Sequence, residues 1–392
     1  MATSIPVIQI IGPTPPPHHG VSVATQVLLD SLPSGRFRVV HLDTADRRGI
    51  AHVDQPDLWD VLLFVRQWLH HVATLLVERP SISYLPLSQS RIGFLRDSFF
   101  MVPAFFMGTA VVVHLHGANF EQVYASSGGL FRCYVDWVFR RVRQFIVLGE
   151  MLRPIFERWA QVTDVAVVPN GVPEHGCAPI VRQARPADQR CRILFLSTLS
   201  KAKGLLVLLD ALAVVARDDP QFECHIAGPW WGVGIEAEAR KRLTQLGLES
   251  VVTFHGPLTG EEKMRFLASG DLFVFPGVQQ EGQPLTVLEA MCVGLPVVAT
   301  DRGCIRETVL EGVTGYVVPP NAPDLIAERV LRLMRDGELR RRLSIEARRR
   351  FEREYTMATF ASRMADLFAR LSDSDYHGSP SAMSSHHWST ER

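Results

Sequence analysis

The stretch EGQPLTVLEAMCVGLPVVATD (281–301) decides how this chain folds. Glu281 and Glu289 are eight residues apart, and Pro284 lies between them. Proline is favoured in the first turn of a helix, so we expect Glu281 in the loop before a helix and Glu289 on its second turn. The unpaired amides of the first turn then lie between two carboxylates, and such amides bind phosphate. Two hydroxyl acceptors beside a phosphate seat suit a sugar nucleotide.

Apolar runs flank the two glutamates on both sides. DLFVFPG (271–277) precedes them and LPVVATD (295–301) follows them, and both have the pattern of buried strands. The result is a strand–loop–helix–strand unit, whose loop lies at the carboxyl edge of a parallel sheet, where open α/β sheets bind ligands. Taken alone, the two glutamates are equally well explained as acids on a solvated helix. The flanking strands are what favour a ligand site.

The same alternation of strand and helix runs along the whole chain and predicts an α/β protein with parallel sheets. A polar, proline-rich segment divides it into two series, and 392 residues predict about two domains. The expected strands are 5–11, 36–42, 81–86, 109–115, 144–148, 163–168, 192–197, 222–227, 250–255, 272–276, 296–300 and 315–318. Helices are expected over 20–32, 57–78, 91–107, 129–142, 150–160 and 205–217.

The domain boundaries follow from this pattern. We expect an N-terminal domain over 1–172, a linker over 173–190 and a C-terminal domain over 191–356, followed by a helix over 357–371. The remainder, 372–392, is rich in serine and histidine, has little to bury, and is expected to be disordered. Asp373 and Asp375 form a D-x-D pair in this tail, which we interpret as chance rather than as a metal site.

Charge and cysteine content narrow the class of protein. The chain has 41 basic and 41 acidic residues, so its formal net charge of zero gives no global attraction to nucleic acid. Its only lysines are Lys201, Lys203, Lys241 and Lys263. The six cysteines include no C-x-x-C pair, and no basic, apolar leader precedes the first strand. This pattern is typical of a cytoplasmic protein.

Two stretches have the composition of membrane-surface helices. SFFMVPAFFMGTAVVV (98–113) is the most apolar run, and it falls short of the roughly 18–20 apolar residues that a spanning helix needs. FRCYVDWVFRRVR (131–143) carries arginines beside aromatic side chains. Two interpretations stay open: both are sheet-covering helices of a globular domain, or they bring the protein into peripheral contact with the inner face of the membrane.

Further sequence motifs support the interpretation of Glu281 and Glu289 as part of a ligand site. In the C-terminal half they are VVPNGVP (167–173), LSTLSKAKG (196–204), IAGP (226–229), FHGPLTGEEKMRFLASGDLFVFPG (254–277) and ETVLEGVTGYVVPPNAPDLIAERV (307–330). In the N-terminal half they are IIGPTPPPHHGVSVAT (10–25) and HLHGANF (114–120). With these motifs the chain resembles the retaining GT-B glycosyltransferases of the E-x7-E type, also called group 1 or family 4. The resemblance covers essentially the whole C-terminal half and is looser in the N-terminal half.

The resemblance implies a GT-B architecture, in which two Rossmann-like domains face a cleft and the last helix (357–371) crosses back onto the first domain. It implies that a sugar is transferred from a nucleoside diphosphate sugar to a glycan or lipid-linked acceptor with retention of anomeric configuration, plausibly in bacterial polysaccharide biosynthesis. Neither a cofactor nor a metal ion is expected. A GT-B sugar-nucleotide epimerase and an inactive sugar-nucleotide-binding scaffold are the alternatives.

Lys203 is the expected partner of the donor phosphates. It ends the loop after the strand RILFLS (192–197), and lysine is a good point-charge partner for phosphate. The family usually has an arginine five residues earlier, where this chain has Thr198. Either the Thr198 hydroxyl or Lys201 is then expected to take over that contact.

By resemblance, Glu281 binds hydroxyls of the donor sugar, Glu289 binds the ribose, and His116 points at the donor sugar. His114 lies on the same strand face as His116. We expect these groups to act by positioning and electrostatics, because no residue in the pattern has the features of an obligatory base. The expected catalytic residues are Glu281, His116 and Lys203. The expected donor-binding residues are Gly20, Thr198, Lys203, Gly282, Gln283, Pro284, Leu285, Thr286 and Glu289.

Overall fold

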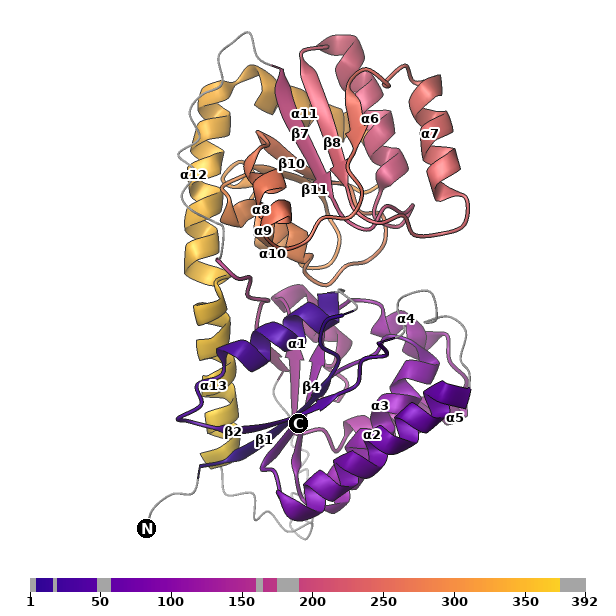
Figure 1. Ribbon diagram of the computed structural model, residues 1–392, viewed down its shortest axis with the longest axis vertical. Helices are drawn as coiled ribbons and strands as arrows, with labels where there is room; N and C mark the ends of the chain where they lie inside the picture. Colours follow the sequence, from indigo (N-terminus) through magenta and orange to yellow (C-terminus); the bar gives the residue numbers. More distant parts are fainter. Residues whose placement is uncertain (1–4, 17–19, 48–57, 160–164, 175–189, 374–392) are drawn as a thin grey trace, which may run out of the picture.

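The computed structural model describes residues 5–16, 20–47, 58–159, 165–174 and 190–373. Two α/β domains are stacked end to end, and one long helical segment runs along the side of both (Figure 1). Every strand pairing within the two sheets is parallel, as the alternating pattern predicts. The expected strands all form, with ends shifted by no more than two residues.

The sheet of the N-terminal domain has the strand order β2-β1-β3-β4-β5-β6. Its strands are β1 (Val7–Gly12), β2 (Arg38–Asp43), β3 (Ile82–Pro86), β4 (Ala110–Leu115), β5 (Gln144–Val147) and β6 (Val165–Val167). The helices between them are α1 (Gly20–Ser31), α2 (Leu58–Val77), α3 (Arg91–Phe106), α4 (Phe120–Ala125) and α5 (Gly129–Phe139). The strand order reverses between β1 and β3, so the loops after these strands face a crevice at the carboxyl edge.

One expected helix, over 150–160, does not form as such. The structure has a short 3₁₀ helix, η2 (Glu150–Ile155), followed by a turn. Its N-terminal amides are held by the other domain, because the Glu307 carboxylate accepts hydrogen bonds from the amides of Glu150 (2.7 Å) and Met151 (2.6 Å). Pro154 contributes no amide to a longer helix. A tertiary contact and a proline therefore override the local helical pattern.

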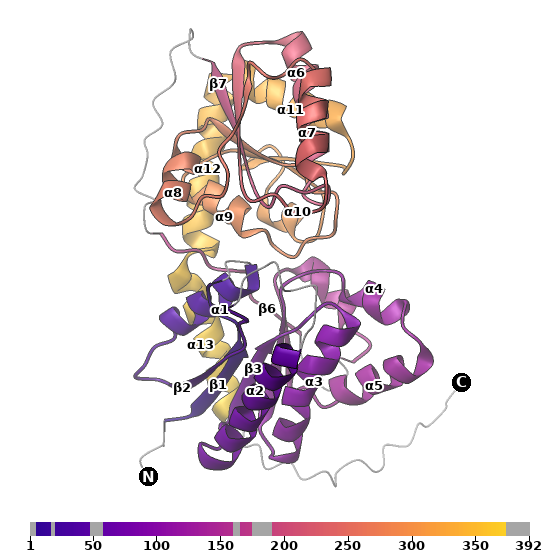
Figure 2. The same ribbon diagram turned by 45° about the vertical axis from the view of Figure 1, so that its right-hand side comes forward.

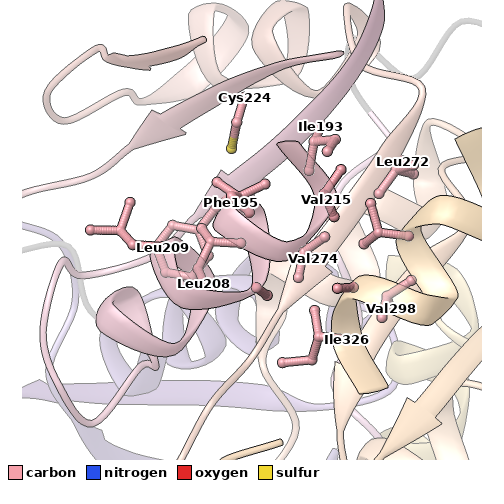
Figure 3. Packing of buried hydrophobic residues seen from close by; sticks show 14 of the residues in the cluster. Ile193, Phe195, Leu208, Leu209, Val215, Cys224, Leu272, Val274, Val298 and Ile326 are labelled. Carbon is pink, nitrogen blue, oxygen red and sulfur yellow. The ribbon is translucent and has the colours of Figure 1, made fainter. Parts of the chain in front are cut away.

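The sheet of the C-terminal domain has the order β12-β11-β10-β7-β8-β9, which is the order of the Rossmann fold. Its strands are β7 (Cys191–Leu196), β8 (Phe222–Ala227), β9 (Val252–Phe254), β10 (Leu272–Phe275), β11 (Val297–Thr300) and β12 (Gly315–Val318). Its helices are α6 (Leu205–Asp218), α7 (Ile235–Gln245), α8 (Gly260–Ala268), α9 (Leu285–Cys292), α10 (Ile305–Thr308), α11 (Pro323–Arg335) and α12 (Gly337–Glu354). Branched and aromatic side chains of β7 and β10 pack against α6 (Figure 3). The sheet order reverses between these two strands.

The last helix, α13 (Met357–Asp373), leaves the C-terminal domain and completes the core of the N-terminal one. Figures 1 and 2 show it continuing from α12 and lying along the first domain. Its buried Phe368 makes edge contacts with the rings of Phe37 (6.3 Å) and Tyr84 (6.0 Å). The helix continues through Ser372 and Asp373, which the sequence pattern assigned to the tail. The tail itself, including Asp375, and most of the expected linker lie outside the described residues.

The two domains also meet in the middle of the molecule. The Asn170 amide donates to the Gln283 side-chain oxygen (2.8 Å), and the Val172 amide donates to the Tyr355 carbonyl (3.0 Å). These contacts join the end of the first sheet to the start of α9 and to the end of α12. No helix among the described residues has both the length and the apolarity needed to cross a membrane.

We predict that Phe368→Ala destabilises the N-terminal domain although the residue follows the C-terminal domain in sequence. Deleting a buried phenylalanine ring typically costs about 3–5 kcal/mol. Calorimetric unfolding should show a lower transition temperature for the N-terminal domain. The exposed neighbour Arg370→Ala is the control, for which a shift of no more than about 0.5 kcal/mol is expected. Equal effects of the two substitutions would show that α13 does not anchor this domain.

Candidate active site

A cavity of about 430 Å³ lies between the two domains, at the carboxyl edges of both sheets. Its walls come from α1 and the loop after β4 on one side, and from α8, α9 and the loops after β7, β8 and β10 on the other. The expected catalytic and donor-binding residues all line this cavity: Gly20, His116, Thr198, Lys203, Glu281, Gly282, Gln283, Pro284, Leu285, Thr286 and Glu289. Residues from distant parts of the chain therefore converge at one place.

Lys203 and Glu281 face each other across the point where the order of the second sheet reverses. The Lys203 ammonium donates to Glu281 Oε1 at 2.5 Å. The two loops that carry them are tied together, because the Ala202 carbonyl accepts hydrogen bonds from the amides of Val278 (2.9 Å) and Gln279 (3.2 Å). Gly204, which ends the lysine loop, has φ = +80°, and a Cβ there would lie 1.9 Å from the Pro276 carbonyl oxygen. Glycine is therefore required for the loops to approach this closely.

A second lysine–glutamate pair lies deeper in the cavity. Glu289, on the second turn of α9, accepts a hydrogen bond from the Lys263 ammonium of α8 at 2.5 Å. Its other oxygen, Oε2, is buried and has no hydrogen-bond partner among the described residues. A buried carboxylate oxygen without a partner is energetically costly, so it marks a place where a ligand hydroxyl could donate.

Burial shifts the pKa values of both carboxyl groups in the same direction. It raises the pKa of Glu281 and of Glu289, and the adjacent Lys203 and Lys263 ammonium groups oppose that rise. Each lysine therefore supports the ionised form of its glutamate, and each pair is close to neutral as a whole.

The start of α9 is fixed by the contact between the domains. Pro284 is the N-cap of the helix, one position earlier than its expected place in the first turn. The amides of Leu285 and Thr286 follow it, and amides in the first turn have no acceptor within the helix. The Gln283 side chain, just before the cap, donates to the Thr308 hydroxyl (3.1 Å) and accepts from the Asn170 amide. The positive end of this helix therefore points into the cavity in a fixed direction.

His116 lines the cavity on the side of the N-terminal domain. Its ring lies on that of His114, with 4.0 Å between centroids, and His114 Nδ1 is 2.8 Å from the Tyr84 hydroxyl. Burial lowers the pKa of His116 to about 4, an effect that the Asn170 side chain partly offsets, so the ring is neutral near pH 7. The opposite domain comes very close, since a Cβ on Gly282 would lie 2.2 Å from the His116 carbonyl oxygen.

The structure places the two expected replacements for the missing arginine differently. Thr198 lines the cavity, half-buried, at the carboxyl end of β7. Lys201 is 66% exposed, pairs with Glu238 of α7 at 2.7 Å, and does not line the cavity. Lys201 is therefore not positioned to replace the arginine, because its loop turns its side chain toward α7.

Lys263 is the functional candidate that sequence reasoning missed. It lies in the stretch 254–277, where its position on a helix is equally compatible with a solvated surface residue. The signal that could have found it is scarcity: a chain with 41 basic residues has four lysines, and two of them, Lys203 and Lys263, face the cavity glutamates. Ser197, Gly228 and Thr259 also line the cavity and were not predicted.

Comparison with known proteins bears on the family and the fold. The model of the family described as "Glycosyl transferases group 1" matches residues 179–350. The C-terminal domain is therefore similar to the group 1 glycosyltransferases, and the two domains together have the GT-B fold of such enzymes. In the solved structures, a glycosyltransferase from Rickettsia africae ESF-5 superposes with a TM-score of 0.75 at 13% identity, covering 95% of this chain and 100% of that one. HepE of Anabaena, solved in complex with UDP-glucose, superposes with a TM-score of 0.71 at 19% identity, covering 93% of this chain and 99% of that one.

Curated relatives match over part of their length. The amylovoran biosynthesis glycosyltransferase AmsK of Erwinia amylovora is 30% identical over 188 residues, which are 47% of this chain and 46% of that protein. The phosphatidyl-myo-inositol mannosyltransferase of Mycobacterium tuberculosis is 27% identical over 246 residues, 60% of this chain and 63% of that protein. The chain thus spans about half to under two thirds of the curated relatives that it matches.

We predict that Lys263→Ala both destabilises the protein and weakens nucleotide binding. It leaves the Glu289 carboxylate buried without its cation, a loss of about 1–3 kcal/mol in the free energy of unfolding. Lys263→Met combined with Glu289→Gln should recover much of that stability, because no buried charge remains, while nucleoside diphosphate binding stays weak in calorimetric titration. The exposed Lys241→Ala is the matched control. Full recovery of binding in the double variant would show that the pair is purely structural.

The buried His116 ring also predicts a pH dependence of stability. An unfolded histidine takes up a proton near pH 6.5, whereas folded His116 stays neutral down to about pH 4. The unfolded state therefore binds more protons between these values, so stability falls as pH drops from about 6.5 toward 4. His116→Asn should reduce this slope by up to about 1.4 kcal/mol per pH unit, measured by urea unfolding at several pH values. The exposed His70→Asn should leave the slope unchanged, and an unchanged slope in His116→Asn would contradict the assignment.

Proposed function

We propose that this protein is a retaining glycosyltransferase that moves a sugar from a nucleoside diphosphate sugar to a glycan or lipid-linked acceptor in the assembly of a bacterial polysaccharide or glycolipid. The observation that carries the proposal is the pair of lysine–glutamate contacts in one interdomain cavity, Lys203–Glu281 and Lys263–Glu289. The start of α9 lies between the two glutamates along the chain.

The lysines, the glutamates and the first amides of α9 match the groups of a nucleoside diphosphate sugar. Its diphosphate needs positive charge and amide donors, which the Lys203 ammonium and the first amides of α9 supply. Its sugar and ribose hydroxyls need acceptors, which the two carboxylates supply. The unpartnered Oε2 of Glu289 is the acceptor that we assign to the ribose. When the diphosphate binds, Lys203 can contact both a phosphate oxygen and Glu281.

The proposed mechanism of transfer follows from the negative charge that develops on the leaving phosphate. The acceptor oxygen forms a bond to the anomeric carbon while the bond from that carbon to the diphosphate oxygen breaks. The nucleoside diphosphate leaves with the bonding electrons, and the acceptor proton passes to its phosphate oxygen on the same face of the sugar. Lys203 stabilises the growing negative charge, which is the role in which a preorganised cation is most effective.

His116 and Glu281 position the donor in this proposal. His116 is held neutral by burial, and Glu281 is paired with Lys203, so neither is arranged as a strong free base. Retention without a protein nucleophile is consistent with this arrangement, because front-side attack assisted by the departing phosphate needs no base from the protein.

The named relatives support the class of substrates. HepE was solved with UDP and with UDP-glucose, and TarM of S. aureus was solved with UDP. AmsK is named for amylovoran biosynthesis, and the mycobacterial relative is named as a mannosyltransferase acting on phosphatidyl-myo-inositol. These names support a nucleoside diphosphate sugar as the donor class and a glycan or lipid-linked molecule as the acceptor class.

The test is a transfer assay with UDP-, GDP- and ADP-sugars and bacterial glycolipid acceptors, in which NMR of the anomeric proton reports the configuration of the product. We expect retention, and we expect activity to survive EDTA because lysine and helix amides carry the phosphate charge. Among the described residues, no group of three or more potential ligands could hold a metal ion. Inverted product would exclude the mechanism, and complete loss in EDTA restored by manganese would exclude metal independence.

The same assay separates the two alternatives. An epimerase would produce epimerised nucleotide sugar without any acceptor. An inactive scaffold would bind a nucleotide sugar, which raises its melting temperature, and would turn over none of the donors.

We predict that Lys203→Ala lowers kcat by about 10²–10³ with a smaller effect on the donor KM, because the cation acts mainly on the leaving phosphate. Lys201→Ala is the matched control from the same loop, since its side chain pairs with Glu238 outside the cavity, and it should keep turnover within about twofold. If Lys201→Ala abolished turnover while Lys203→Ala did not, the phosphate contact would have been assigned to the wrong lysine.

A further inference from the structure

A second histidine lies beside His116 and has no part in the proposed reaction. His114 is fully buried on β4, two residues before His116, and it does not line the cavity. Its Nδ1 is 2.8 Å from the Tyr84 hydroxyl, and its Nε2 is buried without a hydrogen-bond partner among the described residues. A buried ring nitrogen without a partner destabilises the folded state, whereas an apolar side chain of similar size has no such cost. A histidine at this position therefore needs an explanation beyond packing.

Tyr84 of β3 sets the direction of the hydrogen bond to His114. Its ring is 2% exposed and packs against the His114 ring (5.9 Å between centroids) and the Phe368 ring of α13 (6.0 Å). Burial raises the pKa of the Tyr84 phenol and lowers the pKa of the His114 imidazole well below its usual value, so both groups are neutral near pH 7. A phenol hydroxyl is a better donor than a neutral imidazole N–H, so Tyr84 donates and His114 Nδ1 accepts. The proton of the His114 ring is then on Nε2.

The His114 ring in turn lies against the ring of His116. Their centroids are 4.0 Å apart, and their planes are inclined by 34°. The backbone of His116 has no room to move toward the opposite domain, because a Cβ on Gly282 would lie 2.2 Å from the His116 carbonyl oxygen. The remaining freedom of His116 is rotation of its side chain about χ1 and χ2. A planar ring packed against one face restricts that rotation.

We propose that Tyr84 and His114 are positioning residues, which hold the ring of His116 in one orientation at the wall of the cavity. Phe368 packs on Tyr84, and Tyr84 donates to His114. His114 then lies on His116, so a row of four rings joins α13 to the cavity. A group that is oriented before the substrate binds contributes more to a reaction than one that must first be ordered. The benefit to sugar transfer rests on the proposed function, and the orientation of the ring does not.

The first test needs no substrate. Nitrogen–proton correlation spectra of the imidazole rings in the full chain report the tautomer and surroundings of each histidine, and His114→Asn and His116→Asn identify the two signals. We expect His114 to be protonated at Nε2. Tyr84→Phe removes only the hydroxyl, and it should shift or broaden the signals of both histidines because the orienting hydrogen bond is lost. A His116 signal that Tyr84→Phe leaves unchanged would overturn the proposal.

The second test compares turnover with binding, using UDP, GDP and ADP and the glucose derivative of each. Tyr84→Phe and His114→Leu should each lower kcat in the transfer assay by about tenfold, because His116 is no longer held in place. Calorimetric affinity for the free nucleoside diphosphate should stay within about twofold, since His116 contacts the donor sugar in the proposed reaction. His114→Asn keeps a planar side chain and an acceptor for the Tyr84 hydroxyl, so it should retain kcat within about threefold.

The matched control is Tyr134→Phe, which removes another hydroxyl of the same domain. The Tyr134 hydroxyl donates to Ser98 Oγ (2.9 Å), and neither residue lines the cavity. This variant should change neither kcat nor the signals of His114 and His116. Melting temperatures report the folding of every variant, and Tyr84→Phe and His114→Asn keep the test decisive if His114→Leu does not fold.

Full turnover by His114→Leu would overturn the proposal and make the Tyr84–His114 pair a packing element only. Equal loss of turnover in Tyr84→Phe and Tyr134→Phe would overturn it as well, because the effect would then come from stability. If the unmodified chain turned over none of the donors while Tyr84→Phe still shifted the His116 signal, the proposed function would be refuted and the positioning of His116 would stand.

Discussion

Two carboxylates can lie in the interdomain cavity because each has a lysine ammonium at hydrogen-bond distance. Burial alone would drive Glu281 and Glu289 toward their protonated forms, and Lys203 and Lys263 oppose that drive. The positions of the lysines depend in turn on the fold. Lys203 comes from the loop after β7 and Lys263 from α8. They meet two glutamates of the segment 281–289, which contains the start of α9. The order of the second sheet, which places β7 beside β10, is what makes the first of these contacts possible.

The contacts between the two domains also depend on where the fold places individual side chains. Gln283 joins the start of α9 to Asn170 of the first domain, and Glu307 holds the first amides of η2. Helix α13 adds a covalent tie, since it leaves the second domain and fills a groove in the core of the first. The cavity therefore has walls from both domains that are held at a set distance. Such preorganisation is what transfer between two bound substrates requires.

The cavity and the exposed apolar residues of α2 and α3 lie on different parts of the N-terminal domain. The loops after its strands contribute His116 and Gly20 to the cavity, while the outer sides of α2 and α3 carry the apolar residues. The inner side of α2 combines apolar packing with buried polar groups. Leu75 belongs to the core, and Phe64 and Trp68 pack against it. Gln67 and His71 on the same side find hydrogen-bond partners in the sheet and in α3.

The sequence by itself determined the alternation of strands and helices and the division into two series, because strands and helices have distinct periods and because proline and glycine mark where a helix starts or two loops meet closely. It placed Glu281 before α9 and Glu289 within it for that reason. The resemblance to a known family supplied most of the residues expected around the cavity. Only the tertiary structure decided which cations stand beside those acids. It turned Lys201 outward to Glu238 and brought Lys263 inward to Glu289, a choice that depends on how α8 packs on α9. It also replaced the helix expected over 150–160 by a 3₁₀ turn and left several apolar side chains of α2 exposed. In each case contacts between residues distant along the chain outweighed the local pattern, and periodicity within one segment carries no information about such contacts.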